Sequence, residues 1–230
     1  MDDLHTVCAV LDIEAFQHKS LTFFREIAFA VVDPSLSEAQ LLFSECVFSH
    51  NVYPPFTPPP EDEAVWRTFD YVKHNVTGLD IHPDINDSLT LPQEAVRWLI
   101  LGWFEAVASD ERYRVAYKGG NLEKRLLEWL RIPSLNLEDY CCPSFESLPS
   151  HIRESYPVSC GQHRYCKKGP DHCPIRETSF YRRWLLSVAE GDGGARGKLL
   201  EVGGGGGDIE VDQEGQEVRE MMMCAIDTRS

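Results

Sequence analysis

The 230-residue sequence predicts an α/β domain in which a mixed β-sheet is flanked by helices. An apolar run of strand length, Val7 to Leu11, ends in the acidic sequence Asp12-Ile13-Glu14. A second apolar run follows after a short turn, which is the pattern of an antiparallel hairpin. Beyond residue 60, helical and strand-like segments alternate. The predicted order is three antiparallel strands, then two helices, then β-α-β-α.

The first strand covers residues 6–11 and is rich in β-branched side chains. Residues 17–20 form the predicted turn, and residues 21–33 the second strand. Residues 41–48 fit either a third strand or a short helix, because the run is too short to distinguish the two periods. Residues 53–60 contain five prolines and predict an extended loop.

The later elements follow from helical periodicity and from breaks at Gly and Pro. Pro92 suits the first turn of a helix, and Asn121 suits an N-cap. The tryptophans mostly fall on helical faces, which favours core packing. In chain order, the predicted elements are helix 61–75, helix 91–109, strand 113–117, helix 121–130, strand 134–137, a short helix at 144–152 and helix 174–188.

Length and composition predict one folded domain, residues 1–189, and a Gly-rich, acidic, disordered tail, residues 190–230. The net charge is −15; ten acids and four bases give the tail −6 and leave −9 on the domain. An acidic domain argues against strong sequence-independent binding to nucleic acid. Two stretches are instead net positive. Residues 111–131 hold six bases and three acids, and residues 151–183 hold seven bases and three acids. These are the predicted surfaces for a polyanion.

No apolar run approaches the roughly 20 residues of a membrane span, so no membrane association is expected. The acidic start, MDDLH, lacks the charge pattern of a signal peptide, which predicts an intracellular protein, cytoplasmic or nuclear. The eight cysteines are then expected to be reduced thiols or metal ligands.

Asp12 and Glu14 are the first candidate site. Side chains alternate along a strand, so both carboxylates share one face while Ile13 points to the other. Paired carboxylates at the end of a core strand are oxygen ligands that suit Mg²⁺. The alternative is that the two acids begin a solvated turn.

A second candidate site lies in the Cys- and His-rich insertion at about residues 141–173. Cys160 and His163 have the C-x-x-H spacing of a metal knuckle. With Cys142 and Cys173 they predict a closed, structural Cys₃His zinc site, and Cys141, Cys166 and His172 are possible substitutes. The alternative is free cysteines and a solvated histidine.

The order of elements and the placement of acids resemble the ribonuclease H-like fold, and more narrowly the DEDD 3′–5′ exonucleases. LDIEAF resembles their first motif, YRVAYKGGNLEKRLL the second, and the helix near Cys173 their last helix. The chain also resembles uncharacterised proteins of invertebrate genomes, often near mobile elements, which share D-x-E-x-F, LED-x-x-CP and C-x-x-H followed by Cys.

This resemblance implies that Asp12, Glu14 and Glu123 bind Mg²⁺ or Mn²⁺, with Glu123 where the family has Asp. The family's fourth acid falls at Cys173 here, which leaves Asp171 or Glu177 as substitutes; Asp171 is the predicted one. His163 is a candidate for the family's histidine. Lys118 and Lys124 are candidates for contacts with nucleic-acid phosphates.

The sequence supports two functions. The first is a nucleic-acid-processing protein of exonuclease-like fold that hydrolyses DNA or RNA phosphodiesters with a divalent metal. The second is a catalytically inactive, zinc-stabilised module that binds nucleic acid or protein. A protein partner could use the Pro-rich loop, residues 53–60, or the acidic tail.

Overall fold

The computed structural model describes residues 2–18, 21–32, 47–53, 58, 61–82, 90–108, 111–156, 163 and 172–191. The predicted tail beyond residue 191 and parts of the Pro-rich and Cys/His-rich segments lie outside this range. Within it, no helix is long and apolar enough to cross a membrane.

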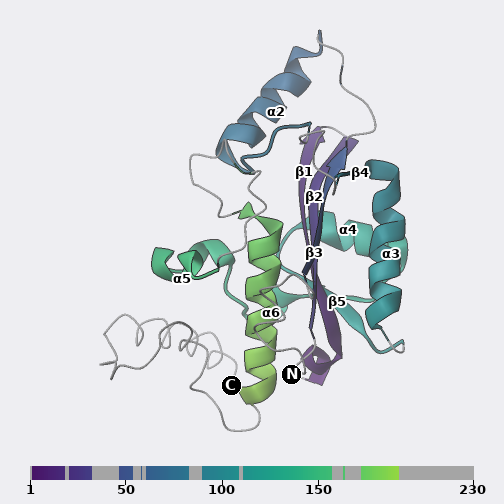
Figure 1. Ribbon diagram of the computed structural model, residues 1–230, viewed down its shortest axis with the longest axis vertical. Helices are drawn as coiled ribbons and strands as arrows, with labels where there is room; N and C mark the ends of the chain where they lie inside the picture. The colour runs from purple at the N-terminus through teal and green to yellow at the C-terminus, as the bar shows by residue number, and fades with distance from the viewer. Residues whose placement is uncertain are drawn as a thin grey trace.

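The chain forms a mixed six-stranded sheet with the order β4-β3-β2-β1-β5-β6, flanked by helices (Figure 1). The strands are β1 (Val7–His18), β2 (Leu21–Val31), β3 (Val47–Tyr53), β4 (Thr90–Pro92), β5 (Arg114–Tyr117) and β6 (Ser134–Asn136). The α-helices are α2 (Glu63–Asn75), α3 (Val96–Val107), α4 (Asn121–Leu130), α5 (Ser150–Glu154) and α6 (Pro174–Gly191). The 3₁₀ helices of the described residues include η1 (Asp2–Thr6), η2 (Gln93–Ala95), η3 (Leu137–Tyr140) and η4 (Phe145–Ser147).

Strand β1 is internal, as predicted. It pairs antiparallel with β2 and parallel with β5. β2 pairs antiparallel with β3, and β5 pairs parallel with β6. An internal strand is buried on both faces, which explains why its first half is a continuous apolar run rather than an alternating one.

The sheet order differs from the predicted one because of β4, a three-residue edge strand parallel to β3. The sequence prediction placed this segment at the start of a helix. Pro92 instead adopts an extended conformation, with φ −68° and ψ 146°, and α3 begins only at Val96 after η2. The residue before a proline, here Leu91, disfavours the helical conformation. Proline has no backbone N–H to donate, so within a sheet it suits an edge strand.

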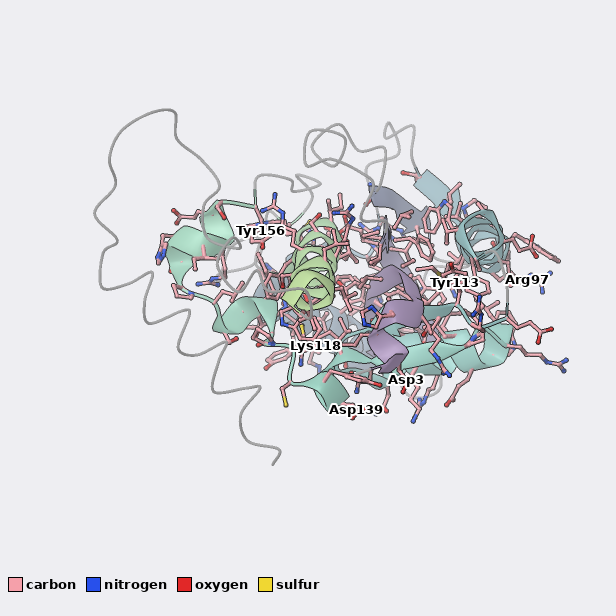
Figure 2. The ribbon with its side chains drawn as sticks, turned by 90° about the horizontal axis from the view of Figure 1, so that it is seen from below. Asp3, Arg97, Tyr113, Lys118, Asp139 and Tyr156 are labelled. Atoms are coloured by element: carbon pink, nitrogen blue, oxygen red, sulfur yellow. The ribbon has the colours of Figure 1, made fainter. Side chains whose placement is uncertain are left out.

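Two apolar layers cover the sheet. On one face, α3 and α4 pack against alternate residues of the central strands, including Leu11, Ile13 and Phe29. On the other face, α6 packs against β1, β2 and β3. Figure 1 shows α6 and α3 on opposite sides of the sheet, and in Figure 2 Tyr156 lies on the α6 side and Arg97 on the α3 side.

Helix α2 covers the far end of the β1–β2 hairpin. A bulge between Glu14 and Ala15 is followed by Phe16, which is fully buried against Phe23 and Phe69. The ring centroids of Phe16 and Phe69 are 5.1 Å apart. The prediction of core packing was wrong for Trp98 and Trp129, which are 63% and 62% exposed; each lies on the outer face of its helix.

Candidate functional site

Asp12 and Glu14 lie in the middle of β1, not at its end as predicted, because pairing with β2 carries the strand on to His18. Ile13 is buried among the side chains on the α3 face, so strand alternation turns both acids towards α6. On β2, Asp12 faces the small residue Ala28, while Glu14 faces Glu26. The strand pairing therefore places three carboxyl groups on one face.

Glu123 reaches this face from α4. The parallel pairing of β5 with β1 has its last pair at Val10 and Ala116, so β1 extends beyond it. The backbone N–H of Ile13 hydrogen-bonds the Glu123 carboxylate. The approach is close: a Cβ on Gly120 would lie 2.8 Å from a carboxylate oxygen of Glu123. Glycine at this position lets the carboxylate sit beside β1.

The start of α6 supplies Glu177 and, just before the helix, His172. Glu14, His172 and Glu177 each offer a ligand atom, and these three atoms lie within 4.8 Å of one another. The Tyr181 hydroxyl donates to Glu177 Oε2 at 3.1 Å, and His172 Nδ1 lies 2.8 Å from Glu146 Oε1. Helix geometry accounts for the first contact, because residues four apart share a helix face.

Each acid of this cluster has a raised pKa. Burial raises the pKa of Asp12 well above its usual value, and the charges of Glu177 and Glu123 raise it further. Burial and the charge of Asp12 raise the pKa of Glu14. Burial and the charge of Glu14 raise the pKa of Glu177, although the hydrogen bond from Tyr181 opposes this. Burial also raises the pKa of Glu123, against the hydrogen bond from Ile13.

The acid cluster is accessible enough to receive an ion. Asp12, Glu14 and Glu177 all retain partial exposure, whereas Glu123 is buried. Carboxylates that repel one another and still reach solvent are stabilised by a divalent cation, and oxygen donors suit Mg²⁺ and Mn²⁺. The donor set therefore fits the metal that the sequence predicts.

A second cluster lies directly beside the first. Glu26, His163 and Cys173 are all buried, and their ligand atoms lie within 4.8 Å of one another. His163 Nε2 is 2.7 Å from Glu26 Oε2, and His163 Nδ1 donates to the Thr77 carbonyl at 2.5 Å. Burial lowers the pKa of His163, but hydrogen bonds with Cys173 and Glu26 outweigh it and raise that pKa to about 11.

The predicted zinc ligands are only partly brought together. His163 and Cys173 converge, but the third member of their group is Glu26. Cys142 packs in the apolar cluster of Phe145 and Tyr181 instead, where burial raises the pKa of its thiol. Cys160 lies outside the described residues, as does the predicted fourth acid, Asp171.

The two predicted nucleic-acid contacts differ in their surroundings. Lys118 forms an ion pair with Glu138 at 3.2 Å. Lys124 is exposed on the outer face of α4. Their role in binding phosphates stays a prediction.

A cleft of about 610 Å³, a volume typical of ligand sites, opens between α2 and the end of the hairpin, and none of the four clustered acids lines it. Phe16 lies in its wall, two residues after Glu14 on β1. Trp66, Arg67 and Lys73 of α2 also line it, as do the acids Glu63, Asp70 and Asp80.

Sequence reasoning missed Glu26 and gave His172 and Glu177 only secondary roles. For these two residues the sequence held a signal: they are five positions apart across the start of a helix, which places both near the same helix end. For Glu26 there was none, because its place opposite Glu14 depends on the register of the hairpin.

Comparison with known proteins does not extend this assignment. No family model matches the chain, and no curated protein or solved structure shows significant similarity to it. The class that the geometry defines is therefore an α/β domain with a carboxylate cluster on one face of its central strand.

Proposed function

We propose that the protein is a ribonuclease H-like, nucleic-acid-processing protein that hydrolyses phosphodiester bonds with a divalent metal. Strand connectivity supports the fold: β1 is antiparallel to β2 and parallel to β5, as in the resemblance drawn from the sequence. The single observation that carries the function is the convergence of Asp12, Glu14, Glu123 and Glu177. Three distant segments bring these acids to one place.

In this proposal, Asp12, Glu14, Glu123 and Glu177 hold Mg²⁺ or Mn²⁺. When bound, such an ion would act as a Lewis acid on the phosphodiester and would lower the pKa of a coordinated water. Glu177 replaces Asp171 as the fourth acid, because Glu177 adjoins Glu14 in the fold.

His172 serves as the general base. Glu146 faces Nδ1, so a proton taken from the attacking water moves to Nε2. The cleft at α2 offers an aromatic side chain, Trp66, and a cation, Arg67, which is ion-paired with Glu63; both side chains suit contact with a nucleotide. The acidic overall charge predicts weak substrate binding, because it repels nucleic-acid phosphates.

The test uses the purified full-length protein with 5′-labelled single-stranded DNA and RNA, and with Mg²⁺, Mn²⁺ or EDTA. We expect metal-dependent cleavage that Asp12→Asn and Glu177→Gln abolish. Glu128→Gln is the matched control, since Glu128 lies on the exposed face of α4. Cleavage that survives Asp12→Asn, or none with either metal, contradicts the proposal.

The Glu26–His163–Cys173 cluster supports a second function, a zinc-stabilised module that binds nucleic acid or protein. Sulfur, nitrogen and oxygen donors within 4.8 Å suit zinc. The contact of His163 Nδ1 with the Thr77 carbonyl is the outer contact that commonly orients a metal-binding histidine. Cys160 stays the predicted fourth ligand.

Metal analysis of the purified protein tests this site. We expect about one zinc per chain, lost in Glu26→Gln and in Cys173→Ala. Cys142→Ala, which alters a cysteine of the neighbouring apolar cluster, should keep its zinc. Loss of zinc from Cys142→Ala but not from Glu26→Gln would instead favour the all-Cys/His quartet predicted from sequence.

A further inference from the structure

The turn η4 contacts His172, which precedes α6, and the Tyr181 hydroxyl, which binds Glu177 of α6. The backbone N–H of Phe145 donates to the Tyr181 hydroxyl at 3.4 Å, and that hydroxyl donates to Glu177 Oε2. The next residue, Glu146, places its carboxylate 2.8 Å from His172 Nδ1. Two consecutive residues thus connect to the candidate site: Glu146 directly to the His172 imidazole, and Phe145 to Glu177 through the Tyr181 hydroxyl.

This turn is anchored firmly to α6. Phe145 is fully buried, and its ring packs against those of Tyr156 and Phe180, with centroids 5.6 Å and 5.8 Å away. The Arg176 guanidinium lies over the Phe145 ring and also bonds the Tyr156 carbonyl at 3.1 Å. A turn held in this way can fix the side chains that it contacts.

The chemistry explains why such fixing matters. A neutral imidazole carries its proton on only one nitrogen, and the hydrogen bond at Nδ1 decides which. A carboxylate at Nδ1 keeps the proton there and presents Nε2 as the acceptor. The Tyr181 hydroxyl in turn restricts the Glu177 carboxylate to one orientation.

We propose that η4 is a positioning element, in which Glu146 sets the orientation and tautomer of His172 and the Phe145–Tyr181 relay sets Glu177. This inference rests on the proposed nuclease function. It names Glu146 and Tyr181 as positioning residues, neither of which needs to touch the substrate.

The first test replaces Glu146, which is about half exposed, with Ala. We expect kcat to fall about tenfold to a hundredfold, the usual range for an outer-contact residue, with KM unchanged. In the nitrogen NMR spectrum of the metal-free protein, His172 should lose its Nδ1–H form. Glu146→Gln keeps an acceptor and should restore that form and most of kcat. Glu154→Ala, at an exposed acid on α5, is the control.

The second test replaces Tyr181 with Phe and measures Mn²⁺ binding by calorimetry. We expect affinity about tenfold weaker. Tyr140→Phe removes a comparable hydroxyl, one that bonds Asp3, and should leave affinity unchanged. The proposal is overturned if Glu146→Ala keeps both kcat and the Nδ1–H form, or if Tyr181→Phe binds Mn²⁺ as the wild type does. If the wild-type protein cleaves no substrate, the proposed nuclease function is wrong. The NMR measurement would still show whether Glu146 sets the tautomer of His172.

Discussion

Removing one charge from the acid cluster should stabilise the metal-free protein. Oxygen atoms of Glu14 and Glu177 lie within 4.8 Å of each other. At this separation two unit charges repel by about 1 kcal/mol in water and about 3 kcal/mol at an effective dielectric constant near 20. Both groups are partly exposed, so the free energy of unfolding of Glu177→Gln in EDTA should rise by a value between these limits. For a domain of this size that is roughly 2–12 °C in Tm.

The dependence on pH has a definite sign. The pKa values of Asp12, Glu14 and Glu177 are raised in the fold, so the folded protein binds more protons than the unfolded chain. Wild-type stability should therefore rise as the pH falls from about 8 towards about 5. His163, with its pKa raised to about 11, acts in the same direction at alkaline pH. Glu177→Gln should flatten the acidic part of this curve.

The assay is thermal unfolding in EDTA and in Mn²⁺ across this pH range. Mn²⁺ should raise the wild-type Tm at pH 8 and have little effect on Glu177→Gln. The Gln amide can still accept from the Tyr181 hydroxyl, so a loss of packing is not expected. A variant less stable than wild type in EDTA, or a wild-type Tm indifferent to divalent ions, refutes the reasoning.

Three further predictions concern the scaffold. Phe69→Ala should lower the free energy of unfolding by about 3–5 kcal/mol in urea titrations, because Phe69 is buried against Phe16 and Phe23. Gly119→Ala should cost roughly 1–2 kcal/mol by the same measurement, since Gly119 has φ +76° and a Cβ there would lie 3.2 Å from Glu138 Oε1. Deleting residues 192–230 should change Tm by less than about 2 °C, because a Gly-rich acidic segment buries little apolar surface; a larger drop would reveal a docked element.

Much of the element order could be read from local patterns. The helix at Asn121–Leu130 was predicted to within one residue, because Gly119-Gly120 before it and Pro133 after it are strong boundary signals; Gly120, not Asn121 as predicted, is its N-cap. Strand β4 was missed, since three residues carry no periodicity. The first strand was predicted too short. In its second half a bulge between Glu14 and Ala15 interrupts the alternation of polar and apolar residues, so this part of the sequence resembles the approach to a turn.

The candidate site also combines features that the sequence predicts with features that need the tertiary structure. Asp12 and Glu14 share a face because of strand alternation alone, and the sequence determines this. Glu123 was expected beside them only from the family resemblance. The arrival of Glu177 and His172 depends on how α6 crosses the sheet, so only the tertiary structure decided it. The partner of His163 and Cys173 proved to be Glu26 because hairpin register, not chain spacing, sets which side chains are neighbours. Sequence spacing fixes the relative positions of ligand side chains only when they lie in the same turn. Ligands from distant segments are brought together by strand register and packing.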